Sequence, residues 1–295
     1  MANCFYHYTD AQTALKILDN NELWMTHVSY LNDSTEGKEL RKILNRMSVP
    51  SGVYNILDYI DKNYESYVCS FSEKGDLLSQ WRGYCPNGEG YAIGFKQPES
   101  YKNLFDDEGI CFRGAREDGN HLTHTTVGYQ PCIYQKKDKQ DVIKALALKL
   151  QSSYESMPTN VKNLVANLPK RSQEWIKVYS YLIQNEKDKV WFNDYIFFKY
   201  CFKNESFKEE NEYRLFITFN ERYHQEPCYR VKNGVFIPYY RFCFDDNLIK
   251  EIIVRKTRQQ ELSKAGLKHY LKHRKGKNDE EIKKLMRLSK IPFRE

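Results

Sequence analysis

Glu210, Glu212 and Arg214 alternate with other residues in the segment 207–217. Side chains of a β-strand point to opposite faces in turn, so this spacing predicts that the three share one face of a strand. A carboxylate in such a place can stabilise a developing positive charge, as carboxylates do around the sugar cation in glycosidases. The same spacing is also typical of an exposed ion pair on a strand face that has no catalytic role.

Two further segments carry polar and aromatic residues where strands are expected to end. They contain His7, Tyr8, Thr9, Ser70, Phe71, Ser72, Trp81 and Tyr84. A histidine on a short strand is more often a packing residue than a ligand-binding one. A tryptophan in a short capped helix is more often a buried core residue. Taken singly, each segment therefore favours a structural role.

The first forty residues show which elements would position His7. Residues 5–8 are expected to form a short strand. Thr9 and Gln12 have the spacing of a capping box, which predicts that a helix begins after Thr9. Its apolar face is expected to consist of Ala11, Ala14, Leu15 and Leu18. Asn20 and Asn21 are expected to end this helix, because asparagine tolerates the left-handed conformation.

The remaining pattern alternates less regularly between strands and helices. Strands are expected at residues 22–28, 67–72, 90–95, 127–134, 213–219, 228–232, 235–238 and 249–254. A short helix at 77–84 and a long helical block from 141 to about 199 separate some of them. Strands that flank a helical block without regular alternation predict an α+β fold rather than a doubly wound sheet. We therefore expect one domain over residues 1–295, with a helical insertion at 136–200 and a basic helical tail at 256–295.

The net charge of +7 is concentrated near the end of the chain. Residues 255–290 carry many more Lys and Arg than Asp and Glu. The candidates for contact with a nucleic-acid backbone are Lys268, Lys272, Arg274 and Lys275. An ordinary solvated helix face is the alternative explanation for this charge.

Several classes of protein are disfavoured by what the sequence lacks. It has none of the glycine-rich phosphate-binding or dinucleotide-binding motifs, no Gly-x-Ser-x-Gly and no His-Glu-x-x-His. Its eight cysteines are scattered without a Cys-x-x-Cys pair, so no metal site is expected. No apolar run approaches a membrane span and no signal sequence is recognisable, so we expect a cytoplasmic protein with no membrane contact.

Taken in order, the segments resemble a known family. The likeness rests on Phe5-Tyr6-His7-Tyr8-Thr9, Tyr30-Leu31-Asn32-Asp33, Ser70-Phe71-Ser72, Ser79-Gln80-Trp81-Arg82-Gly83-Tyr84, residues 90–95 and Glu210-x-Glu212-x-Arg214. They resemble a largely uncharacterised bacterial domain family that is placed in the ADP-ribosyltransferase-like superfamily and often occurs in phage-defence loci. The resemblance implies a split β-sheet core with flanking helices, outside the insertion at 136–200.

The resemblance also implies NAD as the substrate and roles for the site residues. His7 would bind the adenosine-side ribose, while backbone near Tyr8 and Thr9 would meet the nicotinamide carboxamide. Ser70, Phe71 and Ser72 would lie on the second strand of the NAD site, and Trp81 or Tyr84 would cover the nicotinamide ring. Glu212 would hold the nicotinamide ribose and stabilise its cation, and Glu210 would orient or deprotonate the acceptor.

The implied activity is NAD-dependent mono-ADP-ribosyl transfer by a toxin or defence effector, with nucleic acid or protein as the acceptor. An antitoxin or chaperone that neutralises the protein is a candidate partner. Two alternatives remain: a catalytically silent domain that binds a nucleotide or partner, and an NAD glycohydrolase or RNA-end-handling enzyme. The chain departs from the family where Val254 continues into Arg255 and Lys256 instead of Gly-Pro, which alters a turn but not the proposed catalytic residues.

Overall fold

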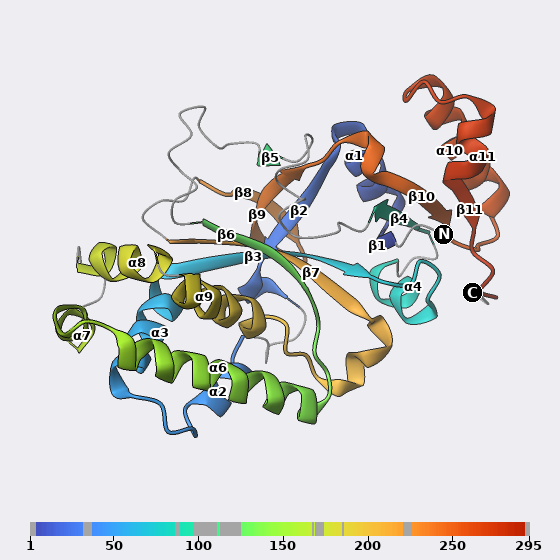
Figure 1. Ribbon diagram of the computed structural model, residues 1–295. Helices are drawn as coiled ribbons and strands as arrows, with labels where there is room; N and C mark the ends of the chain where they lie inside the picture. Colours follow the sequence, from blue (N-terminus) through green and yellow to red (C-terminus); the bar gives the residue numbers. More distant parts are fainter. Residues whose placement is uncertain are drawn as a thin grey trace.

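A large mixed β-sheet forms the centre of the protein (Figure 1). The computed structural model describes residues 4–31, 37–85, 89–96, 111–112, 125–166, 168, 174–184, 186–220 and 226–292. The strands are β1 (Cys4–Thr9), β2 (Glu22–His27), β3 (Tyr64–Ser72), β4 (Tyr91–Lys96), β5 (Cys111–Phe112), β6 (Thr125–Pro131), β7 (Glu212–Asn220), β8 (Cys228–Lys232), β9 (Val235–Cys243), β10 (Ile249–Val254) and β11 (Met286–Leu288). The main path runs β11-β10-β4-β1-β3-β2-β9-β5, and only β10 and β11 are parallel neighbours in the described sheet.

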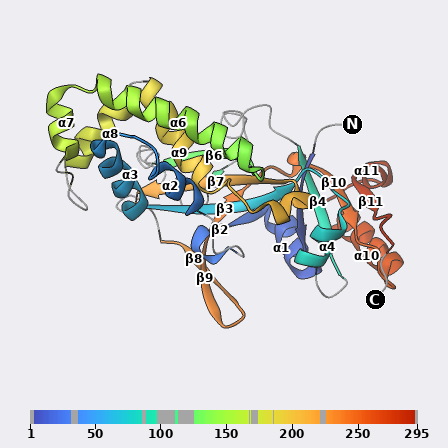
Figure 2. The same ribbon diagram turned by 90° about the horizontal axis from the view of Figure 1, so that it is seen from below.

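Helices cover one face of this sheet and part of the other. They are α1 (Ala11–Asn20), α2 (Glu39–Leu44), α3 (Ser51–Asn63), α4 (Leu78–Tyr84), α6 (Lys136–Ser156), α7 (Thr159–Ala166), α8 (Glu174–Gln184), α9 (Glu186–Lys199), α10 (Gln260–His273) and α11 (Asp279–Leu285), with the short helices η1 (Val28–Tyr30), η3 (Glu205–Glu210) and η4 (Asp246–Leu248). Helices α2, α3 and α6–α9 form one layer, and the β8–β9 hairpin projects from the opposite side (Figure 2). The expected mixture of helices and strands is confirmed.

The two larger apolar cores of the described structure lie on the two faces of the sheet. Val68 of β3 and Phe216 of β7 are neighbours in register, and both pack into the core formed with the helical layer. Tyr67 and Leu215, one position along, pack into the second core with α1, β10 and α10. Because side chains alternate along a strand, successive apolar side chains of β3 and β7 point into opposite cores.

The edge of β3 that faces β1 and β2 is only partly paired. β1 meets β3 at a single residue pair, Tyr6 with Ser72. β2 pairs with β3 only at Tyr67 and Val68. In the described sheet, residues 69–71 therefore have no strand partner on this edge, although β7 pairs along the whole opposite edge. β1 and β2 diverge from β3 at this point and leave a gap in the sheet.

Helix α1 connects the two diverging strands and begins differently from the expectation. Its N-cap is Asp10, whose carboxylate accepts a 2.8 Å hydrogen bond from the backbone N–H of Thr13. Thr9 cannot cap the helix because it remains in β1, paired with Tyr91. Leu15 is 49% exposed, so it is not part of the apolar face. The buried positions are Ala14, Ile17 and Leu18. Asn21 adopts φ of 51° and ends the helix as expected.

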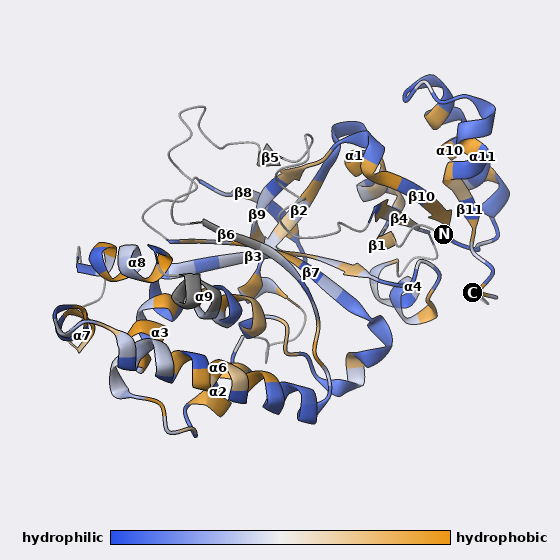
Figure 3. Cartoon of the chain, viewed as in Figure 1, coloured by the Kyte–Doolittle hydropathy of each residue, from blue (hydrophilic) through white to orange (hydrophobic). Residues whose placement is uncertain are grey.

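The C-terminal segment is an integral part of the fold. Leu267 and Leu271 of α10 and Ile282 of α11 pack into the second core. The segment also adds β11 beside β10, a strand that the sequence pattern did not indicate. The remaining surface of both helices is largely hydrophilic (Figure 3). Among the described helices, none is both long and apolar enough to cross a bilayer.

Candidate active site

A cleft of about 840 Å³ opens at the gap between β1, β2 and β3. His7 of β1, Ser70 of β3 and Glu212 of β7 all line it. Pockets that hold small ligands or cofactors generally have volumes of about 300–1,000 Å³. The cleft is therefore large enough for a dinucleotide. His7 and Glu212, far apart in sequence, both line this cleft, which is the arrangement that the resemblance implies.

The proton on His7 is assigned by its hydrogen bond. Its Nδ1 lies 3.0 Å from the carbonyl oxygen of Ser70 on the unpaired edge of β3. A carbonyl oxygen only accepts, so Nδ1 carries the hydrogen and Nε2 keeps a lone pair. Burial lowers the pKa of His7, and the nearby charge of Arg230 lowers it further. His7 is thus neutral at pH 7, and its Nε2 can accept a hydrogen bond.

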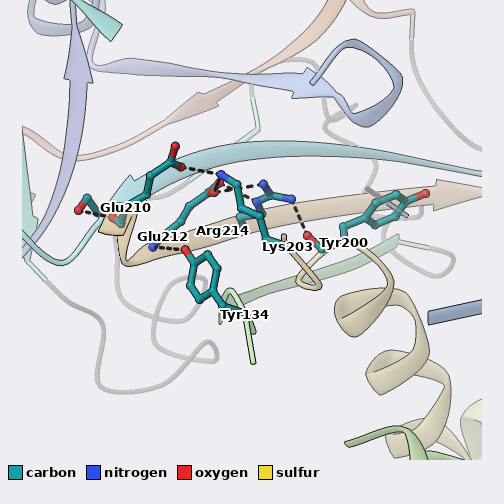
Figure 4. Close-up of polar contacts among 7 residues, drawn as sticks. Tyr134, Tyr200, Lys203, Glu210, Glu212 and Arg214 are labelled. Carbon is teal, nitrogen blue, oxygen red and sulfur yellow. Dashed lines mark hydrogen bonds and ion pairs between the residues drawn. The ribbon is translucent and has the colours of Figure 1, made fainter. Parts of the chain in front are cut away.

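Glu212 lies at the centre of a buried ion-pair network (Figure 4). Its side chain is 4% exposed. Arg214 donates from Nε to Oε1 at 2.6 Å, and Lys203 donates from Nζ to Oε2 at 2.5 Å. Arg214 also donates from Nη2 to Oε2 at 3.2 Å. Glu212 and Arg214 share a strand face as predicted, but the pair is buried rather than exposed.

Glu210 is positioned differently from the prediction. It ends η3 and is not part of β7. Asn211 separates it from the strand with φ of 41°, a left-handed conformation that interrupts strand alternation. Lys203 nevertheless brings the two carboxylates together, because its Nζ lies 2.6 Å from Oε2 of Glu210 and also binds Glu212. The acidic pair is therefore assembled by Lys203 and not by a common strand face.

The end of the helical insertion supplies much of this network. Lys203 follows α9 by a few residues, and the backbone carbonyl of Tyr200 accepts a 2.6 Å hydrogen bond from Nη1 of Arg214. Tyr134, just before α6, accepts a 2.9 Å hydrogen bond from the backbone N–H of Glu212. Tyr134, just before the insertion, and Tyr200, at its end, therefore contact Glu212 and its arginine partner.

The network fixes the charge of Glu212. Burial alone would raise the pKa of this carboxyl, but the Arg214 guanidinium and the Lys203 ammonium lower it from 4.5 to about 2. The same contacts raise the pKa of Lys203, although burial alone would lower it. Both groups therefore remain charged at neutral pH.

Acid is expected to destabilise the protein through Glu212. Because its pKa is lower in the folded chain than in the unfolded chain, the contribution is complete above about pH 4.5 and is lost towards about pH 2. A shift of this size corresponds to about 3 kcal/mol in the free energy of unfolding. Urea unfolding between about pH 6 and pH 3 measures this loss. The free energy of unfolding of Glu212→Gln should depend less on pH than that of the original chain. Equal pH dependence in both proteins would contradict the lowered pKa of Glu212.

The serines of β3 have different roles. Ser70 lines the cleft, and its carbonyl orients His7. Ser72 is fully buried; its hydroxyl donates to the backbone carbonyl of Glu210 at 2.7 Å and accepts from the N–H of Lys74. Ser72 therefore positions the acidic pair and does not reach the cleft. Phe71 lies on the opposite strand face and borders only a small adjoining cavity.

The aromatic residues also differ in role: some pack in the core, and Tyr84 lines the cleft. Trp81 is 1% exposed, donates from Nε1 to Asp76 at 2.8 Å and packs edge-on against Tyr8. The Tyr8 hydroxyl donates to the carbonyl of Lys74, so the side chains of Tyr8 and Trp81 have structural roles. The expectation that Trp81 covers a ligand is wrong, because its ring is enclosed by the core. Tyr84 is 37% exposed and lines the cleft.

Tyr84 and Thr9 complete this wall of the cleft. Burial raises the pKa of the Tyr84 hydroxyl, and the charges of Glu212 and Glu210 raise it further. The phenol is therefore protonated at neutral pH and lies close to both carboxylates. Thr9 is buried, lines the cleft and accepts a hydrogen bond from Cys85 through its carbonyl.

The basic residues of the C-terminal segment are paired with acids. Lys268 and Lys272 both contact Asp279, at 3.0 and 3.8 Å. Arg274 contacts Asp19 at 3.4 Å, and Lys275 contacts Asp246 at 3.0 Å. These contacts partly neutralise the four residues predicted to bind nucleic acid. They also attach the C-terminal segment to α1 and η4.

Several cleft residues were not indicated by the sequence patterns. They are Lys16, Trp24, Lys203, Arg230 and Lys232. The available signal for Lys203 was its place within an apolar run shortly before the acidic pair. The others come from a helix and two strands that meet only in the folded chain.

Comparison with known proteins shows a likeness over one segment of the chain. Residues 80–215 match a family described as "Protein of unknown function (DUF2971)". The matched segment begins at α4 and ends just after Arg214, so it contains Tyr84, Glu210 and Glu212. No curated protein and no solved structure matches the chain. Likeness to an uncharacterised family is thus supported for this segment.

Proposed function

We propose that this protein is an NAD-dependent mono-ADP-ribosyltransferase. The observation that carries the proposal is the cleft shared by His7 and Glu212 at the gap in the sheet. The diverging strands β1 and β2 support a split-sheet core of the kind expected from the ADP-ribosyltransferase-like resemblance. An effector in phage defence that modifies nucleic acid or protein is the setting this resemblance implies.

Glu212 would stabilise the ribosyl cation. When the bond between the nicotinamide nitrogen and C1′ of ribose breaks, its electron pair leaves with nicotinamide and positive charge develops on the ribose. A carboxylate has about four acceptor positions. Lys203 and Arg214 use three of those of Glu212. The remaining position can accept the ribose 2′-hydroxyl while the anionic charge faces the cation.

Glu210 would act on the acceptor. Its side chain is more exposed than that of Glu212. Lys203 binds its carboxylate, and Ser72 binds its backbone carbonyl. The acceptor's nucleophilic atom forms the new bond to C1′ and gives its proton to Glu210. His7 would accept a ribose hydroxyl through Nε2, with its ring held by Ser70.

Tyr84 would cover the nicotinamide ring, and its removal should weaken NAD binding. Tyr84→Ala is expected to raise the dissociation constant of NAD about tenfold, since base–aromatic stacking contributes about 1–3 kcal/mol. Trp81→Phe is the matched control. It removes the hydrogen bond to Asp76 in the core and should leave NAD affinity unchanged. Titration calorimetry measures both, and equal affinities for the Tyr84→Ala variant and the original chain would exclude Tyr84 from the site.

A second candidate function is a catalytically silent nucleotide-binding domain. It is favoured by the charge balance of the network, in which Lys203 and Arg214 offset both Glu210 and Glu212. A neutral cluster stabilises a cation less than an unpaired carboxylate does. The cleft would be retained in such a domain, but the ribosyl bond would not be broken.

One experiment separates these candidates. Purified protein is incubated with cell lysate and NAD labelled on the adenylate moiety, and both released nicotinamide and label bound to macromolecules are measured. Transfer of label supports the transferase, whereas nicotinamide release without transfer identifies an NAD glycohydrolase. NAD binding without either product identifies the silent domain. Digestion of labelled material with nuclease or protease then distinguishes the two acceptor classes.

A further inference from the structure

Arg230 lies in the cleft without an acidic partner. It is on β8, and its Nη2 donates to Oγ1 of Thr26 on β2 at 2.9 Å. Its Nε is buried and has no hydrogen-bond partner among the described residues. Within that part of the chain, no carboxylate forms an ion pair with Arg230, whereas Lys203 and Arg214 are both paired.

Other cations and an aromatic ring surround the same point. Lys232 follows Arg230 by two positions in β8, so the two side chains share a strand face. Lys16 of α1 also lines the cleft. The Nζ of Lys16 and the Cζ of Arg230 lie 5.6 and 5.7 Å from the centroid of the Trp24 ring. In the described structure, neither lysine forms an ion pair with a carboxylate.

The acidic residues that line the cleft are already engaged. Glu210 and Glu212 are balanced by Lys203 and Arg214. Asp10, the third acidic residue in the lining, is engaged with Thr13 at the start of α1. A partly buried guanidinium without a counter-ion is unfavourable. Burial accordingly lowers the pKa of Arg230, and an anionic ligand would remove this cost.

We propose that Arg230 and Lys16, which both lie beside the Trp24 ring, bind the diphosphate group of a nucleotide together with Lys232. The guanidinium fork matches phosphate oxygens. Thr26 holds Nη2, and Nη1 forms no hydrogen bond among the described residues, so it is the donor that a phosphate in the cleft would meet. The proposal rests on the proposed function for the identity of the dinucleotide. It orients NAD in the cleft, with the diphosphate at Arg230 and the nicotinamide ribose at Glu212.

The test compares ADP with adenosine, because the two ligands differ only in the diphosphate. Titration calorimetry on the intact chain should show that ADP binds at least tenfold more tightly than adenosine and that salt weakens ADP binding. Arg230→Gln should abolish that preference and leave adenosine affinity unchanged. Arg287→Gln is the matched control; it removes an arginine that pairs with Glu251 and does not line the cleft, and it should leave ADP binding unchanged.

A second variant distinguishes loss of ADP binding from loss of the folded structure. Arg230→Lys keeps a positive charge but not the guanidinium fork, so it should bind ADP with intermediate affinity. The thermal unfolding midpoints of both Arg230 variants are expected to lie close to that of the original chain, since the substitutions affect one hydrogen bond to Thr26 and no ion pair. Equal affinity for ADP and adenosine in the original chain, or unchanged ADP binding in Arg230→Gln, would overturn the proposal.

The outcomes also separate this proposal from the proposed function. Arg230-dependent ADP binding without nicotinamide release would retain the diphosphate site and reject the transferase. Glu212-dependent transfer of ADP-ribose with unchanged ADP binding in Arg230→Gln would retain the transferase and reject the diphosphate site. Glu212→Gln should leave ADP affinity within about twofold, because ADP lacks the nicotinamide ribose that Glu212 would contact.

Discussion

Replacing Glu212 with Gln is expected to reduce nicotinamide release from NAD about 100-fold to 1,000-fold. That is the typical effect of removing one group that stabilises transition-state charge. Gln has nearly the same shape as Glu and can still accept a hydrogen bond from Arg214, but it lacks the negative charge that faces the ribosyl cation. The loss should therefore appear in kcat, while KM changes little. Single-turnover release of nicotinamide measures the chemical step directly.

Glu210→Gln is the matched control for this prediction. Glu210 binds the same Lys203 nitrogen, so both substitutions remove one carboxylate from the same network. Glu210→Gln should reduce transfer to the acceptor and largely preserve nicotinamide release, because Glu210 would act on the acceptor. If both variants lose nicotinamide release equally, the intact ion-pair network, and not Glu212 itself, is what nicotinamide release requires. Full activity of Glu212→Gln would contradict the proposed mechanism.

Replacing Lys203 with Met is expected to lower the free energy of unfolding by about 3–5 kcal/mol. The side chain is buried and binds Glu210 and Glu212 together. Its removal leaves two carboxylates close to each other with Arg214 as the remaining cation of the network. The pKa of Glu212 should rise, because one of the charges that lowers it is lost. Urea unfolding at neutral pH measures the change in stability.

Lys284→Met provides the same substitution in an exposed ion pair. Lys284 contacts Glu280 at 2.8 Å, but the two side chains are 75% and 77% exposed. Such pairs contribute about 0–1 kcal/mol. The double variant Lys203→Met/Glu212→Gln should recover part of the stability lost in Lys203→Met, since the unpaired charge is removed. If Lys203→Met lowers the free energy of unfolding no more than Lys284→Met does, Lys203 does not stabilise the network.

The sequence predicted the elements that depend on local periodicity. The alternation of Glu212 and Arg214 predicted their common face, because both lie within one regular strand. Glu210 was assigned to the same strand, but Asn211 adopts a left-handed conformation that period-two alternation does not reveal. The start of α1 was misplaced for a similar reason: strand pairing keeps Thr9 in β1, and Asp10 caps the helix.

Long-range packing determined what the patterns could not predict. Lys203 and Arg230 belong to segments with no recognisable motif, and only the folded chain brings them to the cleft. Trp81 and Tyr84 lie in the same short helix, and their opposite exposures depend on which side faces Tyr8. Strand β11 is three residues long, which is too short to show a period of its own.

The single pair of Tyr6 and Ser72 is the junction between two groups of strands. Strands β11, β10, β4 and β1 form one group, and β3 joins β7, β2 and β9 in another. Strand pairing between the two groups occurs at that one point in the described sheet. Across the rest of the boundary, side chains hold the groups together, as where Phe95 of β4 packs edge-on against Phe71 of β3. Because Ser72 also holds Glu210, the position of the acidic pair depends on this one junction.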